Sequence, residues 1–267
     1  MLKRVIRGVL ASDPSGLVLK LSQPTFTVDP NTVKTGSGVY AAGEWSETRR
    51  KGHSIYGTDG TEYDSDQKFF RFMMRNEATK VHAALDLTAR FDFGRYQSIL
   101  ELGAGAVIQG AIIKSRIDRQ YCASDYDPFV TEKVAKLSLV SGITTRVIDA
   151  TRIGPDDLKG FDLVVSWGLD YALDDDALVR LFRSCVAARL DYLMCSASTT
   201  TLLNFLVYRL RRRRIDARIS RREMRAHGWS RSVALLRAKG REAGLPSEYL
   251  GKLWPYQVLL FRRRHAH

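Results

Sequence analysis

Residues 98–113 read SILELGAGAVIQGAII: an apolar run that ends at Glu101, two glycines, and a second apolar run. The first run predicts a strand and the second a helix. Gly103 and Gly105 permit a tight turn between them and a close approach of a ligand to the backbone, because glycine has no Cβ. The dinucleotide-binding fingerprint needs a third small residue where this chain has Ile108, and a pyrophosphate site would not carry a carboxylate just before the glycines. The junction therefore predicts a ligand site, and the carboxylate favours a cationic ligand.

Outward from this junction, short apolar segments alternate with amphipathic ones. The expected strands are residues 98–102, 120–124, 145–149, 161–167, 190–198 and 256–264. The expected helices are residues 65–90, 106–117, 128–140, 175–188 and 230–245, with a basic helical segment over residues 203–229. This alternation is typical of βαβ units and predicts an α/β fold with a doubly wound, mostly parallel sheet. Ligands of such sheets bind at the carboxyl ends of the strands, where the strand order reverses.

Acidic residues follow the next two expected strands. SDYDP, residues 124–128, ends the second strand, and an acid there can accept hydrogen bonds from both hydroxyls of a ribose. We assign this role to Asp125; Asp127 is the alternative, although it is also well placed to cap the following helix. Asp149 follows the third strand, where it could accept a hydrogen bond from a purine amino group beside the N–H of Ala150. An ordinary loop aspartate is the alternative interpretation of Asp149.

The order E-x-G-x-G, then an acid after the second strand and an acid after the third, resembles the class I S-adenosylmethionine-dependent methyltransferases. LELGAGA, ASDYDP, VIDAT and FDLVVSWGLDYALDD carry the resemblance, which covers about residues 65–262. It implies a Rossmann-like sheet of seven strands with residues 256–264 as the one antiparallel strand. The chain then divides into an N-terminal extension, residues 1–64, and a methyltransferase domain, residues 65–267. A lid over the site, packing on the sheet edge and a dimer contact are the alternatives for the extension.

The resemblance implies S-adenosyl-L-methionine as the cofactor. The glycine loop, residues 101–105, would pass under its methionine part, and Asp125 would hold the ribose. Asp149 would hold the adenine, and Trp167 with the loop after it would close over the methyl group. Many members of the family carry a third glycine in the first motif, where this chain has Ala106 and Val107. The expected cofactor-binding residues are Glu101, Gly103, Ala104, Gly105, Asp125, Tyr126, Asp149, Ala150 and Trp167.

Methyl transfer from a sulfonium asks little of the protein, because the methyl carbon is already electrophilic. Alignment of nucleophile, methyl carbon and sulfur supplies much of the catalysis, and a hydroxyl acceptor would also benefit from a general base. His227 is the first candidate for that base, because in this family its stretch often covers the acceptor pocket. Asp170 and Tyr171, after the fourth strand, are the next candidates. The remaining candidates are His53, His82 and Asp174.

Positive charge is concentrated in one segment of a chain whose net charge is +13. Residues 207–241 hold twelve arginines and one lysine against two carboxylates, so they contribute +11 of that charge. A solvated helix is one interpretation; contact with a phosphorylated acceptor, an anionic membrane surface or RNA is the other. RNA is the less favoured partner, because residues 209–228 contain no phenylalanine, tyrosine or tryptophan on which a base could stack.

The loop after the expected fourth strand lacks the motifs of some acceptor classes, and this narrows the choice of acceptor. SWGLDY has neither the proline pair of amino-methylating nucleic-acid enzymes nor the Pro-Cys nucleophile of base-carbon methylators, and no metal-ligand spacing is apparent. We expect O- or N-methylation of a small-molecule or saccharide-type acceptor, with a phosphorylated or lipid-linked one preferred. The alternatives are an RNA methyltransferase that uses the arginine-rich segment and a scaffold that keeps the fold without the reaction.

Signals for targeting are weak. No apolar stretch approaches the roughly 20 residues that span a bilayer, and the N-terminus lacks the long apolar core of a cleaved signal. A weak interfacial anchor is the alternative interpretation of residues 2–10. Cys122, Cys185 and Cys195 lie in apolar segments, which predicts buried thiols in a reducing compartment. We expect a cytoplasmic protein, with a peripheral membrane position as the alternative.

Overall fold

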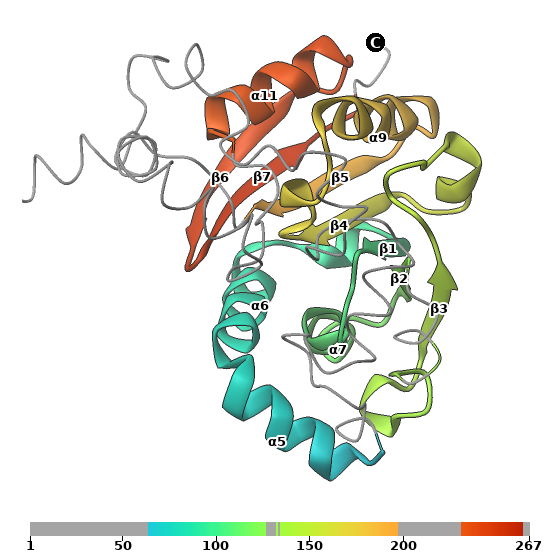
Figure 1. Cartoon of the computed structure of the whole chain (residues 1–267), viewed down its shortest axis with the longest axis vertical. Coiled ribbons are helices and arrows are strands. Elements are labelled where there is room, and N and C mark those ends of the chain that lie inside the picture. Colours follow the sequence, from blue (N-terminus) through green and yellow to red (C-terminus); the bar gives the residue numbers. More distant parts are fainter. Residues whose placement is uncertain (1–63, 127–131, 133, 197–230, 264–267) are drawn as a thin grey trace, which may run out of the picture.

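The computed structural model describes residues 64–126, 132, 134–196 and 231–263. Its centre is one seven-stranded sheet with the order β3-β2-β1-β4-β5-β7-β6 (Figure 1). The strands are β1 Ser98–Leu102, β2 Gln120–Asp125, β3 Ile143–Val147, β4 Leu163–Trp167, β5 Asp191–Ser196, β6 Ser247–Leu253 and β7 Tyr256–Phe261. β1 to β5 pair in parallel, and β7 runs antiparallel to both β5 and β6. The predicted doubly wound, mostly parallel sheet of seven strands is confirmed.

The strand order reverses between β1 and β4. From β1 the chain builds the sheet outward to β2 and β3, and it then crosses to the other side of β1 to form β4 and β5. Glu101 on β1 accordingly pairs with Ala123 on one side and with Val165 on the other. Because a doubly wound sheet binds ligands beyond the carboxyl ends of its strands at such a reversal, Glu101 and the turn after it stand at the expected place.

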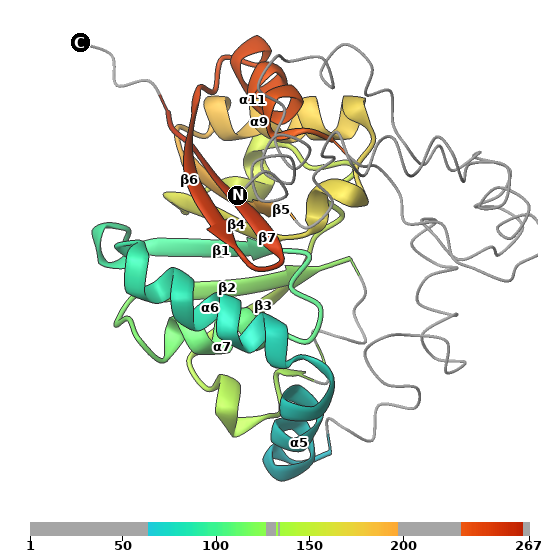
Figure 2. The ribbon, with the colours of Figure 1, turned by 90° about the vertical axis from the view of Figure 1, so that its left-hand side faces the viewer.

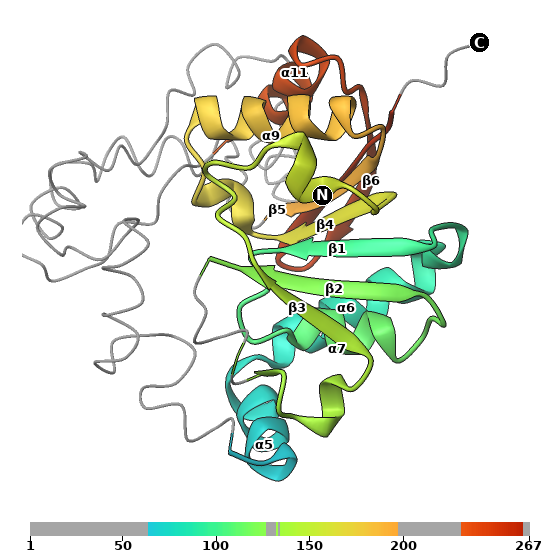
Figure 3. The same cartoon turned by 90° about the vertical axis from the view of Figure 1, so that its right-hand side faces the viewer.

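Helices cover both faces of the sheet. The helices are α5 Asp66–Asn76, α6 Ala78–Arg90, α7 Ile108–Lys114, α9 Asp175–Ala187 and α11 Val233–Glu242, with short 3-10 helices η2 Phe93–Arg95, η3 Ser138–Val140, η4 Pro155–Leu158 and η5 Leu169–Tyr171. α6 and α7 lie on one face and α9 and α11 on the other (Figures 2 and 3). Side chains alternate along a strand, so Ile99 enters the core beneath α6 and α7, whereas Leu100 enters the core beneath α9.

The single helix expected over residues 65–90 is wrong: the structure has two helices there. Glu77 separates α5 from α6, because its φ of −128° and ψ of 17° leave the helical region. Glu77 is buried, and its carboxylate pairs with Nζ of Lys80 at 2.8 Å. The break allows α5 to bury Phe69 and Phe72 in the cluster that contains the glycine-loop alanines, while α6 packs on the sheet.

Two strands also differ from expectation. β3 lies two residues earlier than residues 145–149, because the chain turns at Asp149 soon after the strand ends. The sequence pattern does not predict β6 at all. Its sequence, SEYLGKL, is polar and largely exposed, and Gly251 at φ +104° adjoins a β-bulge that interrupts the alternation.

Some predictions fall outside the described residues. They include the extension up to residue 63, the basic segment 203–229 and residues 128–131 and 133 of the helix expected over residues 128–140. The two-part division of the chain therefore stays a prediction. The end of the helix expected over residues 128–140 is wrong, because the chain turns at residues 135–136 and residues 138–140 form the 3-10 helix η3. The three cysteines are free, buried thiols, as predicted. In the described part of the chain, every helix is too short or too polar to reach across a bilayer.

Candidate functional site

The turn after β1 is left-handed at both glycines. Gly103 has φ +66° and Gly105 has φ +53°, which glycine adopts at little steric cost. The N–H of Ala104 between them donates to the carbonyl of Ser124 on β2 (2.9 Å), which ties the loop to the neighbouring strand. A Cβ on Gly103 would lie 3.0 Å from the side chain of Leu169. The two glycines thus form a tight turn at the carboxyl edge of the sheet.

Asp125, the last residue of β2, lies against this turn. It is 4% exposed, and its Oδ2 accepts a hydrogen bond from the N–H of Gly105 at 2.9 Å. A carboxylate has about four acceptor sites, so one N–H bond is compatible with further hydrogen bonds to a diol. Tyr126 follows and is half-buried. Asp127, the alternative to Asp125, lies outside the described residues.

Glu101 lies inside the protein, on the sheet face that α6 and α7 cover. Its side chain is buried, and Oε2 accepts a hydrogen bond from the hydroxyl of Tyr121 on β2 at 3.0 Å. Among the described residues, Oε1 has no hydrogen-bond partner. Burial raises the pKa of Glu101 to about 8; the Tyr121 hydrogen bond lowers it, and the charge of Asp125 adds to the rise. The expected carboxylate therefore carries its proton at pH 7.

Asp149 and Ala150 lie in the turn after β3. Oδ1 of Asp149 accepts hydrogen bonds from the N–H and the hydroxyl of Thr151, at 2.9 and 2.6 Å, and Oδ2 lies 3.8 Å from the guanidinium of an exposed arginine. The N–H of Ile148 donates to the carbonyl of Asp125 (3.0 Å), which places this turn beside the end of β2. Oδ1 of Asp149 therefore stabilises the turn in which it lies. The contact with adenine stays a prediction, and it would have to be made by Oδ2.

Trp167 ends β4 on the same sheet face as Glu101. Its ring packs edge-on against Tyr256 of β7, with centroids 5.2 Å apart. Its Nε1 is buried and has no hydrogen-bond partner in the described part of the chain. A buried indole N–H usually has an acceptor. Two buried polar atoms, Nε1 of Trp167 and Oε1 of Glu101, are thus unpaired on one face near the carboxyl edge.

Asp170 lies in η5, the turn after β4, and is fully buried. Its Oδ2 accepts a hydrogen bond from the hydroxyl of Ser196 at the end of β5 (2.6 Å), and its Oδ1 has no hydrogen-bond partner among the residues described. Burial raises the pKa of Asp170 to about 6, while the Ser196 hydrogen bond and the charge of Arg231 lower it. A pKa near neutrality suits a general base.

Arg231 is a residue that the sequence reasoning missed. Its side chain is 1% exposed, and the guanidinium donates to the carbonyls of Asp170 and Leu173, both at 2.7 Å. It also pairs at 2.8 Å with the carboxylate of Asp175, which Lys239 contacts at 2.7 Å. Arg231 thereby fastens the start of α11 to the loop between β4 and α9. In the sequence it is one arginine of a basic run, and no spacing distinguishes it from its neighbours.

None of the other candidate bases is seen beside Asp170 in the described part of the chain. His227 and His53 lie outside the described residues, as does the side chain of Tyr171. His82 is exposed on α6. Asp174 caps α9 by accepting a hydrogen bond from a backbone N–H in the first turn, at 2.7 Å.

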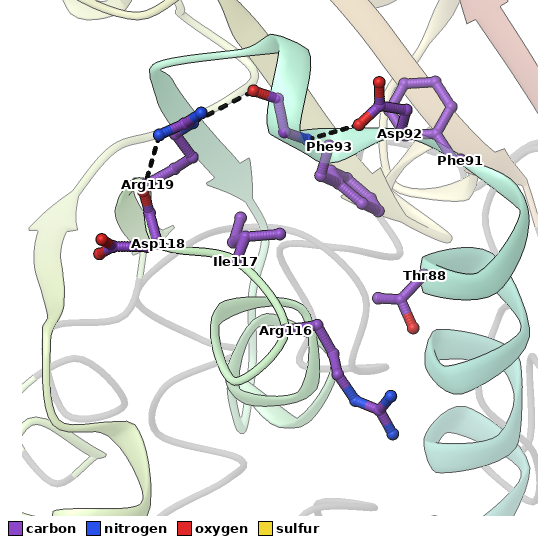
Figure 4. A pocket seen from close by; sticks show the side chains of 9 residues that line it. Thr88, Phe91, Asp92, Phe93, Arg116, Ile117, Asp118 and Arg119 are labelled. Atoms are coloured by element: carbon purple, nitrogen blue, oxygen red, sulfur yellow. Dashed lines mark hydrogen bonds between the residues drawn. The ribbon is translucent and has the colours of Figure 1, made fainter.

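Two pockets lie away from the predicted site. The first, of about 340 Å³, is formed by the end of α6, η2 and the loop between α7 and β2 (Figure 4). There Arg119 donates to the carbonyl of Gly94, whose N–H donates to Asp92. The second, of about 330 Å³, lies between α6 and the β6–β7 hairpin. No predicted site residue lines either pocket, and the first stands at the amino ends of β1 and β2, opposite the glycine loop.

No family model and no curated protein matches the sequence, but solved structures match the fold. The S-adenosylmethionine-dependent methyltransferase SibL shares 19% identity at a TM-score of 0.55, over 75% of this chain and 59% of SibL. The mitomycin 7-O-methyltransferase MmcR shares 17% identity at a TM-score of 0.55, over 88% of this chain and 66% of MmcR. Human N-acetylserotonin methyltransferase, solved in complex with SAM, shares 15% identity at a TM-score of 0.55, over 88% of this chain and 65% of the human protein.

The chain spans less than two thirds of the length of each of these three methyltransferases. At such identities, the likeness establishes architecture and not activity or substrate. The parallel strands and the antiparallel β7 agree with the architecture expected from the sequence motifs. The chain therefore has the fold of the class I S-adenosylmethionine-dependent methyltransferases.

Proposed function

We propose that the chain is an S-adenosylmethionine-dependent methyltransferase that acts on an oxygen or nitrogen of a small-molecule or saccharide-type acceptor. The observation that carries the proposal is the hydrogen bond between Gly105 and Asp125. It joins a glycine turn to a buried carboxylate beside the reversal of the strand order. The names of the matched structures add support, since all three are methyltransferases and one was solved with SAM.

In this proposal the cofactor supplies a methyl group on a sulfonium, and the residues of the chain bind and orient it. The turn at Gly103 and Gly105 presents backbone without Cβ atoms to the methionine part. Asp125 accepts the ribose hydroxyls, and the turn that contains Asp149 borders the adenine. The proposed set is Glu101, Gly103, Ala104, Gly105, Asp125, Tyr126, Asp149, Ala150 and Trp167.

We assign the general base to Asp170. With a pKa of about 6 the carboxyl is mostly ionised at pH 7, and a hydroxyl or ammonium acceptor could transfer its proton to it. Ser196 and Arg231 fix its position. His227 and Tyr171 are the competing assignments. The preference for a phosphorylated or lipid-linked acceptor depends on the charge of residues 207–241, most of which the structure does not describe.

Calorimetric titration of the full chain with S-adenosylmethionine and S-adenosylhomocysteine tests the cofactor. Asp125→Ala removes charge-assisted hydrogen bonds to the ribose, so its affinity should fall at least about tenfold. Asp156→Ala, which removes an exposed carboxylate in η4, should bind like the wild type. Absence of binding to both ligands, or equal binding of a nicotinamide dinucleotide, would refute the proposal.

Incubation with methyl-labelled cofactor and a cell extract, fractionated into small molecules, lipids and RNA, tests the acceptor. Label in the small-molecule or lipid fraction supports the proposal, whereas label confined to RNA supports the alternative. Asp170→Asn should reduce the labelling rate about 100-fold or more without changing the affinity for the cofactor. An unchanged rate would remove Asp170 as the base.

A further inference from the structure

The carboxyl group of Glu101 occupies a site that three elements close. β1 carries it, and β2 supplies the Tyr121 hydroxyl that donates to Oε2. α7 supplies Gly110, where a Cβ would lie 2.3 Å from Oε2 of Glu101 and 2.9 Å from the ring of Tyr121. Any larger residue at this helix position would displace the carboxyl. Tyr121 and Gly110 therefore determine where the Glu101 carboxyl lies.

No positive charge faces this carboxyl in the described structure. The titratable groups around it are Tyr121 and Asp125 on β2 and Cys195 on β5. None of these three can carry a positive charge, and no described lysine, arginine or histidine forms an ion pair with Glu101. A buried carboxyl without a cation is more stable with its proton than without it.

The unpaired atoms of this site point to a ligand. Oε1 of Glu101 and Nε1 of Trp167 are both buried, and both lack a hydrogen-bond partner within the described ranges. They lie on the same sheet face, near the carboxyl ends of β1 and β4. Buried polar atoms are nearly always paired, so these two atoms are the ones that polar groups of a ligand would satisfy.

We propose that Tyr121 and Gly110 are positioning residues for Glu101, and that Glu101 gives up its proton when the cationic methyl donor binds. The inference rests on the proposed function above. The O–H bond of the carboxyl breaks, the electron pair stays on Oε1 or Oε2, and the proton passes to the solvent. The new carboxylate then faces the sulfonium or the ammonium group of the ligand, and the two opposite charges stabilise each other.

Binding is then coupled to pH. Because burial raises the pKa of Glu101 to about 8, only about a tenth of the protein has the ionised form at pH 7, and about a hundredth at pH 6. The apparent affinity is reduced by that fraction. It should therefore rise about tenfold between pH 6 and pH 7, a range in which the ammonium group of the ligand keeps its charge.

Calorimetric titration of the full chain with S-adenosylmethionine in several buffers of different ionisation enthalpy counts the protons. At pH 7 the slope of the observed enthalpy should give close to one proton released per ligand. Glu101→Gln should release none and lose the pH dependence. Glu242→Gln, an exposed acid in the last turn of α11, is the matched control and should behave like the wild type. S-adenosylhomocysteine keeps the ammonium and lacks the sulfonium, so release with both ligands identifies the ammonium as the partner.

The infrared spectrum of the protein without ligand tests whether Tyr121 positions the Glu101 carboxyl or only stabilises the fold. The infrared C=O band of the protonated Glu101 carboxyl should disappear with a midpoint near pH 8, and Glu101→Gln should lack it. Tyr121→Phe removes a hydrogen bond that lowers the pKa of Glu101, so its midpoint should move to higher pH. A structural role alone would leave the midpoint unchanged.

The outcomes distinguish this inference from the proposed function. Binding with no proton released at pH 7 overturns the inference and leaves the methyltransferase proposal standing. Absence of any binding overturns both. A midpoint that Tyr121→Phe does not move overturns the role of Tyr121, even where protons are released.

Discussion

Glu101, on β1, and Asp170, in the turn after β4, are two buried acids near the carboxyl edge of one sheet. Both are almost inaccessible to solvent, and each accepts a hydrogen bond from one hydroxyl, that of Tyr121 or that of Ser196. Burial is the largest cause of the raised pKa in both, yet the pKa of Glu101 is about 8 and that of Asp170 about 6. Asp170 has the positive charge of Arg231 beside it, whereas Glu101 has the negative charge of Asp125.

Asp175 extends the comparison. It is partly exposed and pairs with both Arg231 and Lys239, and its pKa is lowered because these interactions outweigh its desolvation. In all three acids burial raises the pKa, and the charges of the neighbours determine how much of that rise remains. Glu101, which has no cation beside it in the described structure, has a pKa of about 8, and Asp170, which has Arg231 beside it, has a pKa of about 6.

The largest expected loss of stability comes from removing Arg231, the cation that Asp170 has beside it and Glu101 lacks. Arg231→Met leaves the carbonyls of Asp170 and Leu173 without their donor and should lower the free energy of unfolding by about 3–5 kcal/mol. Arg237→Met, which removes an exposed guanidinium with one long hydrogen bond to a carbonyl, should cost under about 0.5 kcal/mol. Urea unfolding measures both. A loss below about 1 kcal/mol for Arg231→Met would contradict the role given to Arg231.

The pH dependence of stability should differ between the two acids. Folded Glu101 holds a proton that the unfolded chain releases above pH 4.5, so this stabilisation is complete below that pH and is lost as pH rises toward 8. Glu101→Gln should therefore gain about 2–3 kcal/mol over the wild type between pH 6 and pH 8. For Asp170→Asn the corresponding change should lie between pH 4 and pH 6. Identical profiles for the two variants would refute the comparison.

Gly110 lies so close to the Glu101 carboxyl that a side chain at this position should destabilise the fold. Gly110→Ala should lower the free energy of unfolding by about 1–3 kcal/mol, because the new Cβ meets the Glu101 carboxyl and the Tyr121 ring. The loss should shrink in a Glu101→Ala background, where the carboxyl is absent. Gly154→Ala is the control, since its Cβ would meet nothing closer than 3.8 Å. Equal losses in the two backgrounds would contradict the contact.

The smallest effect is expected from the hydroxyl donor of Asp170. Ser196→Ala should cost about 0.5–1.5 kcal/mol. It should also raise the pKa of Asp170 above about 6, because the Ser196 hydrogen bond lowers it. Carboxyl chemical shifts of Asp170 followed against pH measure the change. A lower pKa in the variant would show that the assigned cause is wrong.

The sequence predicts six of the seven strands and the glycine turn, because local patterns determine them. Residues 98–102 form β1 as expected, and Gly105 meets Asp125 as the motif order implies. The contact of Gly110 with Glu101 depends on how closely α7 approaches the sheet. A local sequence pattern does not predict that distance. The protonation of Glu101 could not be predicted for the same reason, since it follows from burial and from the absence of a cation among the described neighbours.

Long-range charge pairing explains the other differences. Arg231 is indistinguishable in sequence from solvated arginines, and only its contacts with Asp170 and Leu173 reveal it. The break at Glu77 accompanies a buried acid whose partner, Lys80, follows in the next helix. β6 escapes prediction because its bulge and polar side chains remove the alternation on which a strand prediction depends.

Ser196 and Arg231 have a consequence for how the chain can be rebuilt. Both contact Asp170, Ser196 through its carboxylate and Arg231 through its carbonyl, so the two residues are held close together although they are far apart in the sequence. Closing a loop between two neighbouring points costs an entropy that grows only logarithmically with loop length. Changes in the length of the chain between Ser196 and Arg231 should therefore alter the entropy of loop closure only slightly.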